Sequence, residues 1–279
     1  MQLPTINPRP SRVAVLQVVD QLRSILFPGY FDVVQTGGEG YRYYLGHTIL
    51  GVRSELIEQV MRDICFRCTD RNRMKHCREE AQEKVDAILA ELPAIRESLA
   101  LDADAAYRGD PAATSQEEAV FCYPGLAAVT YHRLAHQFYK NDVPLLARII
   151  AELSHSQTGI DIHPGAMIGD GLFIDHGTGV VIGETAIIGR NVRIYQGVTL
   201  GARSFPTDES GYLIKGVPRH PVVEDDVVIY SGATVLGRIT IGKGSIVGGN
   251  VWLTEDLPPY SRVSQGKLKQ ERFEGGAGI

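Results

Sequence analysis

The first candidate for chemistry is His176, which stands in the run Asp175-His176-Gly177-Thr178-Gly179. A neutral imidazole can remove a proton from an attacking hydroxyl, provided that its second nitrogen is held in one tautomer. Asp175 is adjacent in the chain and supplies a carboxylate. An isolated histidine is also commonly a surface or stacking residue, so the interpretation depends on where the fold places this run.

A second candidate is the run Arg219-His220-Pro221. The planar guanidinium of arginine can donate two parallel hydrogen bonds to a carboxylate, so Arg219 suits an anionic substrate group, with His220 beside it. The chain contains no phosphate-binding loop of the form GxxxxGKS. A phosphorylated coenzyme would therefore have to be held in another way.

A third cluster combines Cys65, Cys68, His76 and Cys77. The ligand types and the spacing of the first two cysteines match a zinc knuckle, although only seven residues separate Cys68 from His76. Four cysteines in 279 residues do not resemble the disulfide framework of a small secreted protein. Ordinary reduced, buried thiols are the competing interpretation, and the sequence leaves both open.

A change of periodicity identifies the elements that must position these residues. From Ile162 onward, aliphatic residues recur at every sixth position. The three series are Ile162, Ile168, Ile174 and Val180; Ile182, Ile188, Ile194 and Leu200; and Val223, Ile229, Val235, Ile241, Val247 and Leu253. A helix repeats every 3.6 residues and a strand every two, whereas a prism with one short strand on each side produces this step. The pattern predicts a hexapeptide β-solenoid, because a β-sandwich would need an alternation that is absent.

Two interruptions break this repeat. The first is a two-residue slip after Ile174, and it contains His176. The second is the 23-residue step from Leu200 to Val223, where the chain must leave the prism as a loop over 201–222. That loop contains the arginine–histidine pair. Interruptions weaken a stable repeat, so we expect these two to serve function. A solenoid that is only a structural scaffold would leave both interruptions unexplained.

The segment that precedes the repeat has helical periodicity. Its apolar residues follow three-and-four spacing, with prolines as interruptions or first-turn residues. The predicted helices span 11–27, 55–63, 78–101, 116–139 and 144–155. We therefore expect an α+β protein with an N-terminal α-helical domain over 1–155, a parallel β-helix over 156–262 and a C-terminal tail over 263–279.

The bulk composition excludes several classes of partner. Charged residues make up 22% of the chain and the formal net charge is -5, so there is no overall basic field for nucleic acid or an anionic membrane surface. No apolar run reaches the length of about 18 residues that a membrane span needs, and the N-terminus lacks the pattern of a signal peptide. We expect a soluble, cytoplasmic protein with neither nucleic acid nor membrane as a partner.

In four runs the chain resembles the serine O-acetyltransferases. The runs are Asp161-Ile162-His163-Pro164, the segment 174–185 (IDHGTGVVIGET), Val198-Thr199-Leu200-Gly201 and, in the helical part, Gly109-Asp110-Pro111-Ala112. The resemblance implies a left-handed parallel β-helix. It also implies transfer of acetyl from acetyl-CoA to the L-serine hydroxyl, giving O-acetyl-L-serine as the first step of cysteine biosynthesis, without a metal.

The resemblance further implies roles for single residues. His176 would be the general base, with Asp161 holding its second ring nitrogen. The residues implied for L-serine are Asp110 and Asp175 toward the ammonium and hydroxyl, and Arg219 and His220 toward the carboxylate. The positions that match the acetyl-CoA groove between neighbouring solenoids are Ala202, Ser231 and Gly249, with Lys243 as a candidate phosphate contact.

Two other enzymes would use the same solenoid. An acetyltransferase acting on a sugar or an antibiotic would share the histidine but would not need Arg219 and Asp110 around an amino acid. A γ-type carbonic anhydrase would need three histidines on zinc. The solenoid contains only His163, His176 and His220, and their contexts match the transferase.

The resemblance also suggests partners. Solenoids of this kind form homotrimers, and in the resembling enzymes the helical region joins two trimers into a hexamer; the sequence leaves trimer and hexamer open. Those enzymes end in isoleucine, which enters the active site of O-acetylserine sulfhydrylase, and this chain ends in Ile279. An incidental terminus is the alternative. Cysteine, a feedback inhibitor in the family, is expected to compete with serine.

Overall fold

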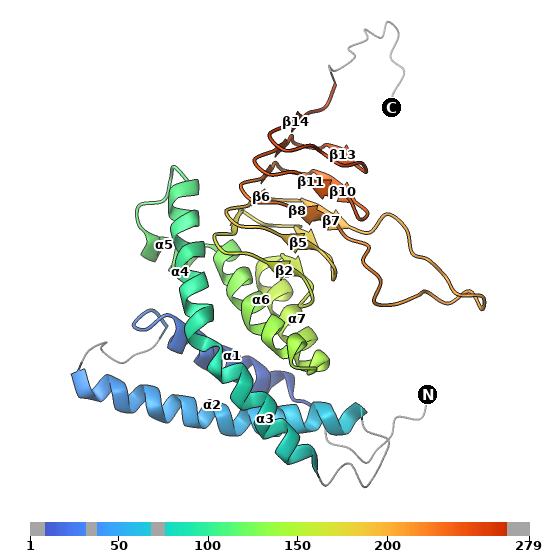
Figure 1. Ribbon diagram of the computed structural model, residues 1–279. Coiled ribbons are helices and arrows are strands. Elements are labelled where there is room, and N and C mark those ends of the chain that lie inside the picture. The colour runs from blue at the N-terminus through green and yellow to red at the C-terminus, as the bar shows by residue number, and fades with distance from the viewer. Residues whose placement is uncertain (1–8, 32–37, 68–75, 267–279) are drawn as a thin grey trace, which may run out of the picture.

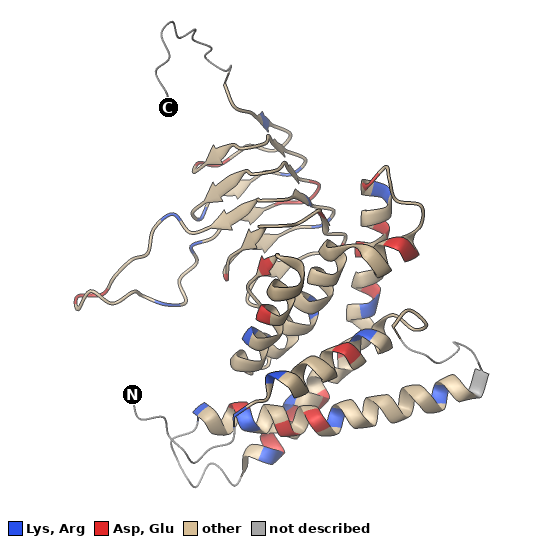
Figure 2. Ribbon diagram, turned by 180° about the vertical axis from the view of Figure 1, so that it is seen from behind, with Lys and Arg blue, Asp and Glu red and all other residues tan. Residues whose placement is uncertain are grey.

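The computed structural model describes residues 9–31, 38–67 and 76–266 (Figure 1). Helices make up the first half of the described chain: α1 (Arg12–Leu26), α2 (Gly38–Arg67), α3 (Cys77–Ala90), α4 (Leu92–Gly109), α5 (Gln116–Cys122), α6 (Pro124–Lys140) and α7 (Pro144–Thr158). None of these helices is long and apolar enough to cross a membrane. Figure 2 shows both signs of charge along the helices and few charges on the β-helix.

The predicted helical region is confirmed, and Pro93 and Pro124 are the interruptions and first-turn residues that the sequence predicted; only the span predicted over 55–63 is too short. The span 55–63 is only the centre of the longer α2. The span 78–101 breaks at Glu91, where Pro93 enters the first turn of α4. The span 116–139 breaks at Tyr123, which is extended (ψ 118°) because a residue before proline avoids the helical region. This second break matters for the site, since it frees Tyr123 from both helices.

The second half is the predicted left-handed parallel β-helix. Its strands are β1 (Asp161–Ile162), β2 (Met167–Ile168), β3 (Phe173–Asp175), β4 (Val181–Ile182), β5 (Ile187–Ile188), β6 (Arg193–Tyr195), β7 (Thr199–Gly201), β8 (Val222–Val223), β9 (Val228–Ile229), β10 (Thr234–Leu236), β11 (Thr240–Ile241), β12 (Ile246–Val247), β13 (Trp252–Leu253) and β14 (Arg262–Val263). They form three parallel sheets. The first sheet has the order β1-β4-β7-β10-β13, the second β11-β8-β5-β2 and the third β14-β12-β9-β6-β3.

The strand register explains the six-residue step. Ile162, Ile182, Leu200, Val235 and Leu253 are successive partners in the first sheet, one from each turn of the prism. Corresponding aliphatic residues fill the interior from the other two sheets. Parallel pairing stacks identical faces, so one inward position on each strand produces a continuous core.

The interior also holds a second row of side chains that the periodicity analysis missed. Two positions before each inward residue lies another buried residue; examples are Ala166, Leu172, Val180, Ala186, Val192 and Val198. Val180 belongs to this second row, because Ile182 is the register partner of Ile162. The prediction that Val180 continues the first series is therefore wrong: the slip falls directly after Ile174 and lengthens the turn that carries His176.

The helices cover the N-terminal end of the prism, where α4 and α6 both contact β3. A buried ion pair fastens this junction: Arg133 of α6 donates to both carboxylate oxygens of Asp102 of α4, at 2.6 and 2.8 Å. The same two side chains bond to the solenoid backbone, Asp102 to the N–H of Leu172 and Arg133 to the carbonyl of Gly169. The C-terminal half of α4 is thus held against the first turn of the β-helix.

The long step in the repeat is a loop between β7 and β8. Figure 1 shows it extending away from the prism. A single antiparallel bridge between Thr207 and Leu213 joins its two arms, and the side chains of Phe205 and Tyr212 are exposed. The arginine–histidine pair lies where this loop returns to the prism.

Candidate active site

His176 lies directly after β3, at the edge where the chain turns from the third sheet into the first. Its φ of 56° is in the left-handed region, which costs a non-glycine residue on the order of 1 kcal/mol. The ring is 71% exposed, and its Nδ1 lies 3.5 Å from Oδ1 of Asp175. Asn191, Asp226 and Asn250 share this conformation at other turns of the prism, so the angle itself belongs to the tight turn. The two-residue slip therefore projects an imidazole outward from a rigid prism.

Asp110 and Tyr123 bring helical residues to the same place. Asp110 caps the C-terminus of α4, and its Oδ2 accepts a 2.5 Å hydrogen bond from the hydroxyl of Tyr123. Its Oδ1 accepts from the N–H of Ala112 at 2.8 Å. These bonds lower the pKa of Asp110, to which the nearby His176 also contributes, so this carboxylate is ionised at neutral pH. We call Asp110, Tyr123, Asp175 and His176 the His176 corner.

Asp161 opens β1 on the outer face of the first sheet, where Val181 is its register partner. Among the described residues it forms no ion pair with His176; Asp175 supplies the carboxylate near that ring. The role of Asp161 as the residue that holds the histidine stays a prediction.

Arg219 is held by a network at another edge of the prism, between the first and second sheets. Its Nη2 lies 2.6 Å from Oε2 of Glu184, whose Oε1 accepts from the hydroxyl of Tyr139 at 3.0 Å. The backbone N–H groups of Arg219 and His220 both donate to Oγ1 of Thr185, at 2.9 and 3.1 Å. The return of the loop is therefore fixed at both the side chain and the backbone of Arg219.

Two imidazoles complete this network, that of His220 buried and that of His163 half-buried. Nδ1 of His220 accepts from the N–H of Thr185 at 3.1 Å, and Nδ1 of His163 accepts from the N–H of Gly165 at 3.0 Å. Burial lowers the pKa of both rings, that of His163 to about 4. Each ring is then neutral at pH 7 and carries its proton on Nε2. We call Tyr139, His163, Glu184, Thr185, Arg219 and His220 the Arg219 corner.

Gly183 fits between the prism and the His220 ring. A Cβ at this position would overlap Cδ2 and Nε2 of His220, so only glycine lets the ring lie flat over β4. The histidine is nearly inaccessible as a result, with 6% of its surface exposed.

The two corners lie on opposite edges of the first sheet within one chain. Strands of the first sheet begin after the His176 corner and end before the Arg219 corner. No hydrogen bond or ion pair between described residues joins the two groups. Within one chain, the proposed base lies with two carboxylates at the His176 corner, and Arg219 lies with His220 at the Arg219 corner.

The four positions matched to acetyl-CoA are not all brought together. Ser231 and Gly249 lie on successive turns at the edge that carries His176, and the carbonyl of Ser231 would be 3.3 Å from a Cβ on Gly249. Ala202 follows β7 at the start of the loop. Lys243 is at the third edge, between the second and third sheets, where it pairs with Asp225 and Asp226 at 3.8 and 3.5 Å.

The Cys-rich segment can be placed only in part. Cys65 and Cys77 are buried, His76 is exposed beside Glu79 at 3.3 Å, and Cys68 lies outside the described residues. Within the described ranges, no group of three or more His, Cys, Asp or Glu side chains could hold a metal ion. The zinc and thiol interpretations both stay predictions, and Ile279 also lies outside the described residues.

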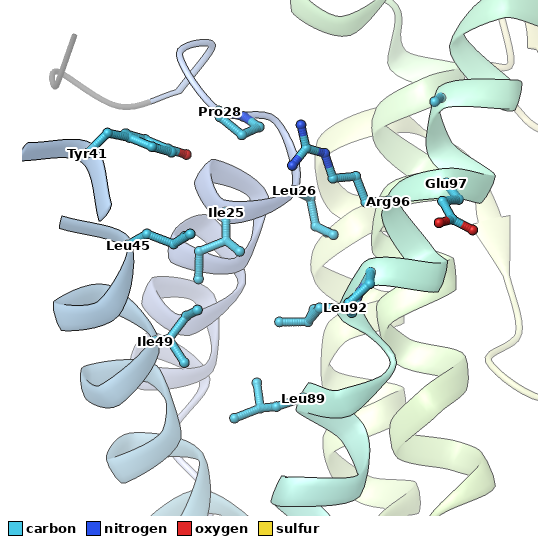
Figure 3. A pocket seen from close by; sticks show the side chains of 12 residues that line it. Ile25, Leu26, Pro28, Tyr41, Leu45, Ile49, Leu89, Leu92, Arg96 and Glu97 are labelled. Carbon is cyan, nitrogen blue, oxygen red and sulfur yellow. The ribbon is translucent and has the colours of Figure 1, made fainter. Parts of the chain in front are cut away.

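A cavity of about 610 Å³ lies between α1, α2, α3 and α4, away from both corners (Figure 3). Figure 3 shows aliphatic side chains directed into it, among them Ile25, Leu45 and Leu92. Arg96 and Glu97 lie at its edge. An apolar space of this kind offers no acid–base pair for chemistry, so the site is assigned to the corners.

Sequence reasoning missed three residues that hold the predicted ones in place. Glu184 and Thr185 belong to the segment 174–185, and their position after an inward isoleucine was a usable signal. Tyr123 precedes Pro124, which predicted a break but not that its hydroxyl would reach the carboxylate at the end of α4.

Comparison with known proteins agrees with this fold. The family described as "Bacterial transferase hexapeptide (six repeats)" matches residues 220–255. "Serine acetyltransferase, plasmid" of Synechococcus elongatus is 52% identical over 276 residues, which cover 98% of this chain and 86% of that protein. Serine acetyltransferase 1 of Entamoeba histolytica, solved in complex with L-cysteine, superposes with a TM-score of 0.78 at 37% identity and covers 95% of this chain and 90% of its own. Soybean serine acetyltransferase complexed with serine has a TM-score of 0.58 at 29% identity, with 93% and 100% covered. The chain belongs to the serine acetyltransferase family.

Proposed function

We propose that this protein transfers the acetyl group of acetyl-CoA to the hydroxyl of L-serine, giving O-acetyl-L-serine and CoA in the first step of cysteine biosynthesis. The observation that carries the proposal is the exposed imidazole of His176 beside the carboxylates of Asp175 and Asp110. We place the reaction in the cytoplasm, where acetyl-CoA and free serine are both available.

His176 acts as the general base. A serine hydroxyl is un-ionised at neutral pH, so a base must take its proton as the oxygen bonds to the thioester carbonyl carbon. The tetrahedral adduct then collapses with cleavage of the carbon–sulfur bond, and the proton held by His176 passes to the departing thiolate. A carboxylate stabilises the imidazolium in between: Asp175 lies within reach of Nδ1, and Asp161 is the residue that the family resemblance implies.

Serine is recognised through its two charged groups. Asp110 is ionised and faces the same space as His176, so it suits the ammonium. Arg219 suits the carboxylate because its guanidinium is already oriented by Glu184, and the Nε2 proton of His220 can add a second donor. No metal is needed for this acyl transfer.

We further propose that each active site forms between two chains of a homotrimer, or of a hexamer of two such trimers. The two corners lie on opposite edges of one sheet, so a neighbouring chain that packs along this sheet would bring its Arg219 to the first chain's His176. The projecting loop supports this arrangement, since Phe205 and Tyr212 would be left in water on a lone chain.

Mixing two inactive variants tests the shared site. Chains carrying H176A and chains carrying R219A each lack one corner. Mixed trimers regain activity if an intact His176 meets an intact Arg219 across an interface. Activity that stays at the level of the separate variants, in trimers shown to be mixed, would place the whole site within one chain.

Acetyl-CoA is the proposed second substrate. Ser231 and Gly249 line the edge above His176, and Ala202 would join them from a neighbouring chain. Lys243 contributes least to this proposal, because Asp225 and Asp226 already neutralise its ammonium.

The assay that tests the activity follows acetyl-CoA consumption with L-serine, homoserine and a panel of sugars. We expect turnover with serine far above the others, and we expect added cysteine to raise the Michaelis constant for serine without lowering the limiting rate. A sugar used in preference to serine would favour the sugar acetyltransferase. Inhibition by cysteine that serine cannot relieve would show that cysteine binds outside the serine site.

The C-terminal residue Ile279 is proposed to bind O-acetylserine sulfhydrylase. One aliphatic side chain and a terminal carboxylate form a sufficient recognition unit for a pocket with backbone donors. Calorimetry with the intact chain and with a chain lacking Ile279 measures the association. Equal binding by both chains, or none by the intact chain, would remove this partner and leave the catalytic proposal untouched.

A further inference from the structure

Three residues lie on successive turns of the prism at the edge between the first and second sheets. Thr185 lies between β4 and β5, His220 lies two residues before β8, and Arg238 lies between β10 and β11. Turns of a parallel β-helix follow one another at about 4.8 Å, so a long side chain on one turn can reach the backbone of the turns before it. Arg238 is therefore placed over the return of the loop that carries Arg219.

The guanidinium of Arg238 bonds to the backbone of both earlier turns. Its Nη1 donates to the carbonyl of Thr185 at 2.7 Å and to the carbonyl of His220 at 3.1 Å. Both carbonyls lie between strands, and no backbone N–H of the described chain bonds to either of them. Arg238 thus supplies a donor that the sheets do not.

The two residues that Arg238 joins are also joined to each other. Oγ1 of Thr185 accepts the backbone N–H groups of Arg219 and His220, and it lies 2.9 Å from Nδ1 of the His220 ring. The threonine hydroxyl therefore fixes the arginine–histidine step from its N–H side. Arg238 fixes the same step from its carbonyl side.

The charge of Arg238 is directed at this backbone and not at an acidic side chain. Within the described ranges Arg238 forms no ion pair, and Glu184, the carboxylate of the Arg219 corner, is bound by Arg219 at 2.6 Å. A hydrogen bond from a charged donor is roughly twice as strong as one between neutral groups, so even an exposed arginine can hold two carbonyls. Arg219 and Arg238 also line one cavity of about 400 Å³ at the base of the loop.

We propose that Arg238 is a positioning residue for L-serine, an inference that rests on the proposed function. By joining the carbonyls of Thr185 and His220, it sets the direction from which Arg219 meets the substrate carboxylate. Two parallel hydrogen bonds form only when guanidinium and carboxylate share a plane, so a small shift of this backbone weakens binding. The base lies at the other corner, so the effect falls on serine binding and not on kcat.

The kinetic test compares R238M, R238K and R262M. Methionine removes the donor and the charge but keeps an unbranched chain, whereas lysine keeps a charged donor. Arg262 is a matched control, because it is also an exposed arginine of the prism but lies on the last strand, β14. We expect R238M to raise the Michaelis constant for serine about threefold to tenfold, with kcat and the acetyl-CoA constant within about twofold. R238K should keep most of the affinity, and R262M should match the wild type.

Thermal unfolding checks that each variant is folded. R238Q keeps a neutral amide donor, and it replaces R238M if methionine impairs folding, with an expected rise in the serine constant of about twofold to fivefold. An unchanged serine constant in the folded variant, in a protein that uses serine, would overturn the positioning role and leave the activity intact. An equal rise in the constants for serine and acetyl-CoA would also overturn it.

Hydrogen exchange separates this inference from the activity itself. Mass spectrometry of peptides that contain Arg219 and His220 should show faster amide exchange in R238M than in the wild type and in R262M, because the loop return is then held from one side only. A wild type that does not acetylate serine would overturn the proposed function, and faster exchange in R238M would still support the hold on the loop return. Equal exchange in R238M and the wild type would overturn that hold.

Discussion

The two corners of the first sheet are built in different ways. At the His176 corner, the imidazole is 71% exposed, lies in left-handed backbone and has one carboxylate at 3.5 Å. At the Arg219 corner, the guanidinium is 22% exposed and lies 2.6 Å from Glu184, while Thr185 fixes the backbone on both sides of the arginine–histidine step. One half is open and the other is preorganised.

This difference matches the work proposed for each half. Recognition of a carboxylate gains from a donor that is already oriented, because less side-chain freedom is lost on binding. A base must instead reach a proton on a substrate that arrives from outside, and its environment is completed only when substrate and a neighbouring chain cover it. Substitution of His176 itself should therefore act on the rate constant, whereas substitutions at the preorganised corner, and those that disturb the Asp110 carboxylate at the open corner, should act on serine binding.

The largest effect is expected for His176→Ala. Loss of a general base should lower kcat by about two to four orders of magnitude, while the fold persists because the ring packs against nothing inside the prism. Steady-state kinetics with saturating serine, together with thermal unfolding, measure both parts; Asp161→Asn should reduce kcat less. Near-normal turnover by the alanine variant would remove the base from this corner.

The position of both corners could be predicted because a strict repeat makes any irregularity visible in one sequence. A slip of two residues and a step of 23 stand out against a period of six, and each contains a candidate side chain. The second inward row was missed because its members are often small, such as Ala166 and Ala186, and alanine carries little periodic signal.

What surrounds the candidates could not be predicted, since it depends on contacts between distant segments. Tyr123 meets Asp110 only because α5 and α6 break between them. Arg219 meets Glu184 across 35 positions of chain, through a loop whose path no local pattern encodes. The two corners are separated because they lie at different edges of the prism. The repeat length alone does not show which edge each interruption occupies.

The next largest effect is expected for Arg219→Lys. A point charge replaces a planar fork that Glu184 holds in place, so the Michaelis constant for serine should rise about tenfold to a hundredfold while that for acetyl-CoA changes little. Both constants are measured in one set of initial rates. An equal rise in the Michaelis constants for serine and acetyl-CoA would place Arg219 outside the serine site. The two corners would then not have the separate roles proposed for them.

A smaller effect is expected for Tyr123→Phe. The variant keeps the ring but removes the hydroxyl that donates to Asp110, so the carboxylate is less firmly oriented and its pKa rises toward the ordinary value. Asp110 stays ionised at pH 7, and the serine constant should rise only about threefold to tenfold. Tyr107→Phe, on the exposed side of α4, is the control. No change in the serine constant would show that the bond from the backbone N–H of Ala112 is enough to position the Asp110 carboxylate.

The smallest effect is expected in the free energy of unfolding at acid pH. It arises at the Arg219 corner, from the imidazole of His163. Nδ1 of His163 accepts the N–H of Gly165, and burial holds the pKa of the ring at about 4, below its ordinary value of about 6.5. Arg148, Arg219 and His220 also oppose its protonation, whereas Glu184 favours it. Between about pH 6.5 and pH 4 the imidazole is protonated in the unfolded chain but stays neutral in the folded chain. The contribution of neutral His163 to the free energy of unfolding is therefore complete above about pH 6.5 and declines toward pH 4.

His163→Asn isolates that contribution, because the amide oxygen can still accept the N–H of Gly165 but does not titrate. Urea unfolding at about pH 7 and about pH 5 should show a smaller loss of unfolding free energy in the variant than in the wild type. The comparison uses the difference between the two pH values, since losing the ring contact with Tyr139 lowers stability at both. His155→Asn, at the exposed end of α7, should keep the wild-type difference. If His163→Asn keeps it too, acid does not act through this imidazole, and the Arg219 corner is no more sensitive to protonation than the rest of the fold.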